Sequence, residues 1–216
     1  MNSNLLANYD EAASVIYLKK RERGFWRKLL NFHEVSIARK SLQIAGNPKS
    51  VLDVPCGTGR FWGMLSETPN RKIYACDFSE DMIKTAKNYR PTSIADRVIV
   101  FKASAFDIPQ TKKSIENVFC MRFMHHITNH DQRLALLREF CRVASNSICV
   151  SLWIDGNYKF YRRKRKKTNK MDGWNRYVVP KVLIENEFRN AGLTIVGRLY
   201  FMRFYSMWCT YILNIG

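Results

Sequence analysis

The chain has 216 residues, enough for one domain with a full hydrophobic core. Hydrophobic residues make up 46% of it and aromatic residues 13%, which excludes a disordered chain, and no apolar run is long enough to span a membrane. The formal net charge of +18 predicts an anionic partner or substrate, such as nucleic acid, anionic lipid, or a phosphorylated or carboxylated molecule.

The N-terminal region shows helical periodicity from residue 8 to residue 45, interrupted at Gly24, and it carries a group of basic residues between positions 19 and 28. The sequence Gly46-Asn47-Pro48 ends this region. We therefore expect an N-terminal helical cap over residues 1–47. The main domain is expected over residues 48–216, with a basic insert at about 155–177.

A glycine-rich turn follows this cap in the sequence VLDVPCGTGRF, which begins at Val51. The apolar run Val51 to Val54 predicts a buried parallel strand, and a helical apolar pattern begins at Phe61. Strand, turn and helix form the first half of a nucleotide-binding βαβ unit. Gly57 and Gly59 would let the backbone approach a ligand closely or adopt a positive φ.

Two familiar ligands of such a turn are excluded. The dinucleotide fingerprint G-x-G-x-x-G needs a small third residue for close packing of helix and strand, and Trp62 stands at that position. A P-loop needs Gly-Lys-Ser/Thr, which does not follow. An ordinary strand–helix turn without any ligand stays open as an alternative.

The turn resembles the first motif of class I S-adenosylmethionine (SAM)-dependent methyltransferases, an acidic residue followed by x-G-x-G-x-G. Asp53 takes the acidic position, Gly57 and Gly59 take the second and third glycine positions, and Pro55 replaces the first glycine. The resemblance implies that these four residues bind SAM. It covers the chain from about Pro48 onward.

The second strand, residues 72–76, ends at Asp77, where a carboxylate can accept hydrogen bonds from both ribose hydroxyls. Ser79 is the expected N-cap of the next helix. This segment resembles the family signature D-x-S-x-x-M, which implies that Phe78 and Met82 flank the adenine. The alternative for Met82 is a role as core filler.

Two later segments complete the predicted cofactor site. After the strand at residues 98–101, Ser104 stands where many relatives place an aspartate for the adenine amino group, and Ala105 follows it. Ser104 can accept one hydrogen bond. The strand at residues 115–120 leads into Met121, the start of a segment that resembles the family's sequence after this strand.

The remaining pattern predicts the rest of the class I fold, a Rossmann-like seven-stranded sheet with an antiparallel last strand and helices on both faces. A turn is expected at residues 144–146. The further predicted elements are helices at residues 134–143 and 179–190, a strand at residues 147–153, and a final hairpin at residues 193–200 and 204–213.

His125 and His126 are the candidate catalytic bases, with His126 the better one, because histidine titrates near neutral pH. Methyl transfer needs mainly positioning, and it needs a base only if the nucleophile carries a proton. The alternative is that one histidine packs against Phe123 or the sheet and caps a loop. His126 and His130 lack an evident third ligand, so we expect no metal.

The basic insert contains eight basic residues without an acidic residue between Asp155 and Asp172. They are Lys159, Arg162–Lys167 and Lys170. Three interpretations stay open: a solvated charge run, contact with anionic lipid, and binding of RNA. No RNA-recognition module and no N-P-P-Y tetrapeptide after the fourth strand is visible, which favours a small or lipid-linked acceptor.

The resemblance and these features together predict SAM-dependent methyl transfer to a small or amphipathic, anionic acceptor. The alternatives are an RNA methyltransferase and a non-catalytic SAM-fold binding protein that acts through its basic residues. Six scattered cysteines without a C-x-x-C pair indicate buried free thiols. We therefore expect a cytoplasmic protein, peripheral to the inner face of a membrane through Arg162–Lys167.

Overall fold

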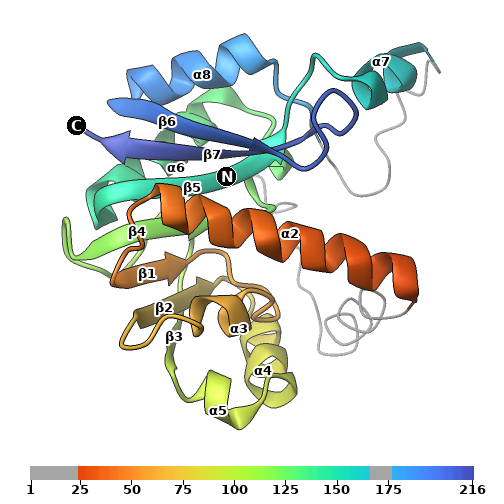
Figure 1. Ribbon diagram of the computed structural model, residues 1–216. Coiled ribbons are helices and arrows are strands. Elements are labelled where there is room, and N and C mark those ends of the chain that lie inside the picture. Colours follow the sequence, from red (N-terminus) through yellow and green to blue (C-terminus); the bar gives the residue numbers. More distant parts are fainter. Residues whose placement is uncertain (1–23, 166–176) are drawn as a thin grey trace.

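The computed structural model describes residues 24–165 and 177–216, in which helices flank a seven-stranded sheet (Figure 1). The strands are β1 (Ser50–Asp53), β2 (Lys72–Asp77), β3 (Val98–Lys102), β4 (Ile115–Cys120), β5 (Ala144–Trp153), β6 (Leu193–Tyr200) and β7 (Trp208–Ile215). Their order in the sheet is β3-β2-β1-β4-β5-β7-β6. Only β7 runs antiparallel to its neighbours, β5 and β6. The predicted fold is therefore confirmed.

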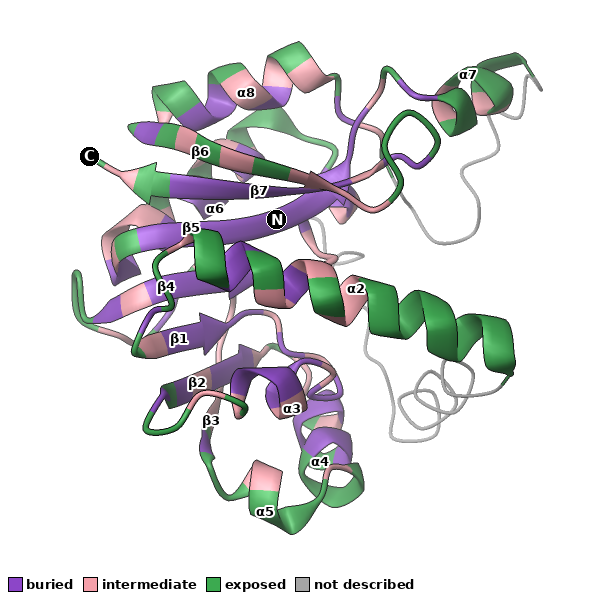
Figure 2. Cartoon of the chain, viewed as in Figure 1, coloured by how far each residue is buried: buried purple, intermediate pink, exposed green. Residues whose placement is uncertain are grey.

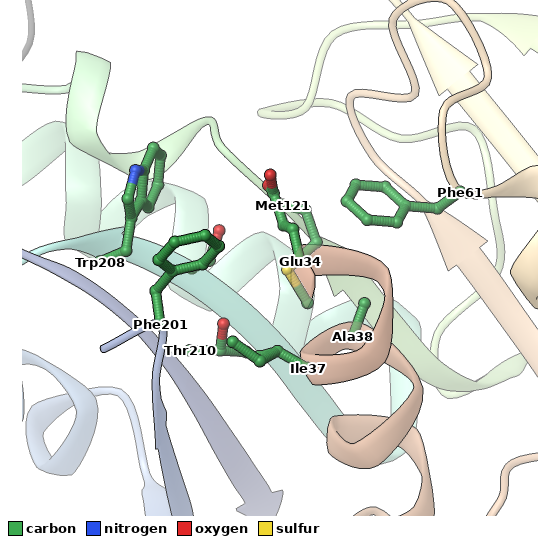
Figure 3. A pocket seen from close by; sticks show the side chains of 9 residues that line it. Glu34, Ile37, Ala38, Phe61, Met121, Phe201, Trp208 and Thr210 are labelled. Carbon is green, nitrogen blue, oxygen red and sulfur yellow. The ribbon is translucent and has the colours of Figure 1, made fainter. Parts of the chain in front are cut away.

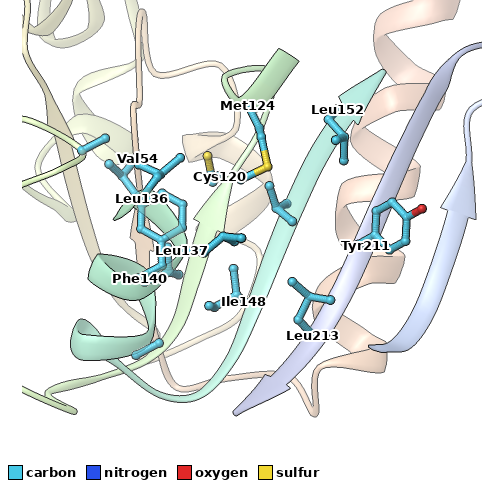
Figure 4. Close-up of a cluster of buried hydrophobic side chains, with 14 of the residues drawn as sticks. Val54, Cys120, Met124, Leu136, Leu137, Phe140, Ile148, Leu152, Tyr211 and Leu213 are labelled. Carbon is cyan, nitrogen blue, oxygen red and sulfur yellow. The ribbon is translucent and has the colours of Figure 1, made fainter. Parts of the chain in front are cut away.

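Helices cover both faces of the sheet (Figure 1). They are α2 (Phe25–Ile44), α3 (Trp62–Leu65), α4 (Glu80–Tyr89), α5 (Thr92–Ala95), α6 (His130–Val143), α7 (Tyr158–Arg165) and α8 (Lys181–Asn190), with a 3₁₀ turn, η2, at Met124–His126. The short helices α5 and α7 bury no residue. Side chains alternate between the faces along each strand, so the neighbours Val51 and Leu52 enter different cores. One core joins the sheet to α2, α3 and α4, and the other joins it to α6 and α8 (Figure 4).

Several element boundaries differ from the sequence prediction. The predicted turn at residues 144–146 belongs to β5, which follows α6 directly. Helix α8 begins at Lys181 instead of residue 179, because Val179 is extended and forms an isolated bridge with Ile154. Strand β7 begins at Trp208 instead of residue 204, because the backbone turns in the segment before it, where Phe204 has a φ of 65°.

Helix α2 lies across one face of the sheet and packs on β6, β7 and α3. Its C-terminal half is anchored by the buried Ala38 and Leu42, whereas its N-terminal half is exposed, with Phe25 75% and Trp26 73% accessible (Figure 2). This helix lies in the cap predicted for residues 1–47, of which residues 1–23 lie outside the described part. Within the described ranges, no helix combines the length and the apolarity that crossing a bilayer requires.

Candidate functional site

Asp77, at the carboxyl end of β2, fastens the glycine turn to the start of α4. Its Oδ2 accepts a hydrogen bond from the Gly57 N–H at 2.8 Å, and its Oδ1 accepts one from the Ser79 N–H at 2.9 Å. Burial raises the pKa of Asp77, and these backbone N–H donors partly oppose that shift. Each carboxylate oxygen can accept a further hydrogen bond, so Asp77 can hold the turn and hydroxyl groups of a ligand together.

Asp53 brings a second carboxyl group to the same place, at the end of β1. The residue is 1% exposed, and its Oδ2 has no hydrogen-bond partner among the residues that the structure describes. Burial, and next the charge of Asp77, raise the pKa of Asp53 well above its usual range, while the Trp62 indole N–H, a donor beside this carboxyl group that is not aligned for a hydrogen bond with it, opposes them. A buried acceptor without a partner fits a site that is completed by a donor from a ligand.

The two glycines of the turn are required for partly different reasons. Gly57 has a φ of 53° and Gly59 a φ of 65°, a conformation that other residues rarely adopt. A Cβ on Gly57 would meet nothing within 4 Å, so open space adjoins it. A Cβ on Gly59 would lie 2.7 Å from Cδ2 of Trp62, which is fully buried. Sequence reasoning used Trp62 only to exclude a dinucleotide and missed this contact.

The residues predicted to contact the adenine differ in how exposed their side chains are. Phe78 is 41% exposed, whereas Met82 in α4 is buried. Ala105 is also buried, and the Ser104 Oγ already accepts a hydrogen bond from the Phe106 N–H at 3.2 Å. Phe78 therefore offers the accessible apolar face in this group, and the adenine contacts stay predictions. Pro55, the residue in place of the first glycine, is half-buried and follows a cis peptide bond.

A small, partly open cleft lies beside the turn, between α2 and the ends of β4, β5 and β7 (Figure 3). Its walls are mostly apolar, with Glu34 contributing a carboxylate. The lining residues are Glu34, Ile37, Ala38, Phe61, Met121, Ser151, Phe201, Trp208 and Thr210. Phe61 comes from the glycine-turn segment and Met121 follows β4, so the cleft adjoins the predicted cofactor site.

Glu34 holds two arginines at this cleft. Its Oε2 accepts a hydrogen bond from Nη2 of Arg60 at 2.7 Å, and its two oxygens lie 3.0 and 2.8 Å from Nη1 of Arg122. Arg60 belongs to the glycine turn and Arg122 follows β4, so this ion-pair cluster links α2 to both segments. No local pattern in the sequence indicates it, because Glu34 and Arg122 are 88 positions apart.

The two candidate bases occupy different surroundings. His125 is 1% exposed, and its ring stacks on Trp153 at 5.6 Å and meets Trp208 edge-on at 4.7 Å. His126 is partly exposed, with its ring 4.1 Å from that of His125. This arrangement favours a packing role for His125 and leaves His126 as the better candidate base. No cluster of metal-binding side chains occurs in the described part of the chain.

The described part of the basic insert is α7 with the loop before it. Arg163 lies 5.7 Å from the Trp153 ring, and Tyr158 stacks on Tyr205 of the loop between β6 and β7. Arg162, Lys164 and Arg165 are exposed. Because Trp153 also contacts His125, α7 adjoins the residues beside the cleft. Residues 166–176, with the rest of the predicted basic run, lie outside the described residues.

Comparison with known proteins relates part of the chain to methyltransferases. Residues 51–147 match the family model of a methyltransferase domain. A demethylmenaquinone methyltransferase of Geobacillus stearothermophilus is 28% identical over 142 residues, which make up 65% of this chain and 55% of that protein. The chain spans between 22% and 55% of the length of the curated relatives that it matches.

Solved structures show how widely this fold is shared. The crystal structure of magnesium protoporphyrin IX methyltransferase from Synechocystis PCC 6803 with bound SAH has a TM-score of 0.76 and 15% sequence identity, over the full length of both chains. The cyclase SpnF has a TM-score of 0.62 and 13% identity, over 83% of this chain and 81% of that one. Likenesses at such low identity establish the fold alone.

Proposed function

We propose, from the match of residues 51–147 to a methyltransferase domain, that the protein transfers a methyl group from SAM to a small or amphipathic, anionic acceptor. The observation that carries the proposal is the pair of carboxyl groups at the glycine turn. Asp77 has spare acceptor positions beside Gly57, and Asp53 has a buried oxygen that the described residues leave unpaired. These groups suit a ligand that offers several hydroxyl and amino donors.

The side chains of the site would bind and orient the two reactants. Bound SAM supplies a methyl group that is activated by a sulfonium. Asp77 would accept hydrogen bonds from the ribose hydroxyls, and the exposed ring of Phe78 would pack on the adenine. The apolar cleft beside Met121 excludes water and positions the acceptor. Where the acceptor atom carries a proton, His126 is the candidate to remove it.

The acceptor class is supported by the cleft and by the relatives. The walls around Phe61 and Trp208 suit an apolar body, and the arginines at Glu34 suit an anionic group. The names of the two methyltransferases above refer to demethylmenaquinone and magnesium protoporphyrin IX, which are both small molecules. A small or amphipathic acceptor is therefore favoured over RNA.

The location that we propose is cytoplasmic, with peripheral contact to the inner face of a membrane. The exposed basic residues of α7 and the exposed aromatic residues Phe25 and Trp26 of α2 have the composition of an interfacial surface. All six cysteines are free, and burial raises the pKa of Cys149 to about 11. Unreactive free thiols are typical of a reducing compartment.

Calorimetry with SAM, S-adenosylhomocysteine and NAD tests the cofactor. We expect the first two to bind and NAD not to bind. Asp77→Ala should weaken SAM binding by about 10- to 100-fold, the loss expected when a hydrogen bond to a charged group is removed. Asp96→Ala, at the exposed end of α5, is the control and should leave binding unchanged. Absence of SAM binding in the parent protein would overturn the proposal.

A further inference from the structure

Arg122 has an unusual backbone for a residue with a long side chain. Its φ is 64°, in the left-handed region that glycine and asparagine favour. The Ser151 Oγ accepts a hydrogen bond from its N–H at 2.8 Å and so holds this conformation. Residues with a strained backbone are frequent at binding and active sites. Here the strain directs the Arg122 side chain toward Glu34 and Trp208, two lining residues of the cleft.

The guanidinium of Arg122 is only partly used within the protein. It lies 4.9 Å from the Trp208 ring, and Nη1 alone makes a hydrogen bond to a described residue, Glu34. The side chain is 21% exposed. The edge formed by Nε and Nη2 therefore has two parallel donors without a described partner. Such an edge matches the two oxygens of a carboxylate or phosphate.

The charges of the cluster point to the same ligand. Arg60 and Arg122 contribute two positive charges and Glu34, which lines the cleft, contributes one negative charge, so the cluster keeps a single positive charge beside the cleft. The three side chains are between 17% and 21% exposed, where opposite charges attract more strongly than at the open surface. One anionic group would balance this cluster.

We infer that Arg122 binds the anionic group of the methyl acceptor through its Nε–Nη2 edge, and that Glu34 is the internal counterion that fixes the guanidinium on Trp208. The inference deepens the proposed function and rests on it. Arg122 is then the residue that selects acceptors with a carboxylate or phosphate, while the apolar walls hold the remainder of the molecule. The alternative anion that could bind this edge of Arg122 is the methionine carboxylate of SAM.

Binding of a matched pair of probes tests this inference by calorimetry, in a buffer without phosphate and with S-adenosylhomocysteine saturating the cofactor site. The probes are 2-naphthoate and its neutral isostere 2-naphthamide. The parent protein should bind 2-naphthoate about 10- to 100-fold more tightly than the amide, the discrimination expected of a hydrogen-bonded charge. Arg122→Gln should abolish this difference, and Arg122→Lys should retain part of it.

Two further variants separate Arg122 from its neighbours. Glu34→Gln should tighten 2-naphthoate binding by about three- to tenfold, because it removes a competing negative charge. Arg39→Gln is the control, since Arg39 also belongs to α2 and pairs with a glutamate, Glu67, but neither residue lines the cleft, so the substitution should leave both probes unaffected. Thermal unfolding establishes that each variant is folded.

The outcomes are distinguishable. Equal binding of the two probes, no binding of either, or retained discrimination in Arg122→Gln would overturn the inference, even where S-adenosylhomocysteine binds normally. A loss of S-adenosylhomocysteine affinity in Arg122→Gln, with probe discrimination intact, would instead assign Arg122 to the cofactor carboxylate. Failure of the parent protein to bind S-adenosylhomocysteine at all would contradict the proposed function.

Discussion

At the scale of single residues, the two glycines of the turn differ in their surroundings: Gly57 adjoins open space, whereas Gly59 packs against Trp62. Gly57→Ala should cost about 1–2 kcal/mol of stability, because only its positive φ opposes a side chain. Gly59→Ala should cost more, since its Cβ would also displace the Trp62 ring. Thermal unfolding of the two variants measures the difference. Equal melting temperatures would contradict the packing that we describe at Trp62.

The buried carboxyl of Asp53 predicts a pH dependence of stability. Its pKa is raised by folding, so its contribution to stability is complete below the ordinary pKa and is lost as the pH rises through the raised value. Asp53→Asn does not titrate. The unfolding free energy of the variant relative to the parent protein should therefore increase from about pH 5 to about pH 8, by up to about 1.4 kcal/mol per pH unit. Denaturant unfolding at both pH values measures this, and a constant difference would contradict it.

The paired histidines should respond differently to the same substitution. His126→Ala should lower turnover by about 100-fold or more, with SAM affinity and melting temperature nearly unchanged, if His126 is the base. His125→Ala should lower the melting temperature, because a ring enclosed by Trp153 and Trp208 is lost. Turnover and thermal unfolding are measured together. A His126 variant that melts early but keeps its specific activity would show a packing residue instead.

At the scale of elements, a buried ion pair joins α6 to α8. Arg133 donates to Glu187 through Nε at 2.8 Å and Nη2 at 2.6 Å, and the His130 ring lies 2.6 Å from the same carboxylate. Arg133 and Glu187 are both at most 1% exposed. Glu187→Ala should therefore destabilise the protein by about 3–5 kcal/mol, since it leaves a buried charge without its partner.

The control for this ion pair removes both charges. Arg133→Met combined with Glu187→Leu should recover most of the lost stability, because a well-packed apolar pair avoids the desolvation of two ions. Denaturant unfolding measures all three proteins. If the double variant is no more stable than Glu187→Ala, the loss is caused by packing and the electrostatic explanation is wrong.

At the scale of the whole molecule, the charge of +18 should direct the protein to anionic surfaces. Replacing Arg162, Arg163, Lys164 and Arg165 with Ser should weaken binding to anionic vesicles by about 1 kcal/mol per residue. SAM affinity should not change. Vesicle sedimentation at two salt concentrations measures the effect, with neutral vesicles as the control. A loss of RNA binding instead of vesicle binding would favour the RNA alternative.

The sequence predicts those parts of the site that depend on neighbouring residues. Asp53, Gly57 and Asp77 were identifiable because each follows a short buried strand, and the carboxyl ends of parallel strands lie at one edge of the sheet. The start of α8 was misplaced because Val179 pairs with Ile154, and the start of β7 because the backbone turns at Phe204.

The side of the site that we propose for the acceptor was not predictable in this way. Glu34, Arg60 and Arg122 each resemble an ordinary surface charge until the fold brings three segments together. The burial of His125 depends equally on Trp153 and Trp208, which come from β5 and β7. Neither arrangement produces a periodic pattern or a motif of fixed spacing in the sequence.

The position of β7 between β5 and β6 also constrains how the protein is made. A ribosome synthesises β6 before β7, yet β6 has no neighbouring strand in the sheet until β7 arrives. During that interval the outer edge of β5 and both edges of β6 expose unpaired backbone groups, the kind of surface that recruits chaperones or aggregates. A chain truncated after residue 207 should therefore be cut readily by protease at β6, and a chain that extends through residue 215 should be protected.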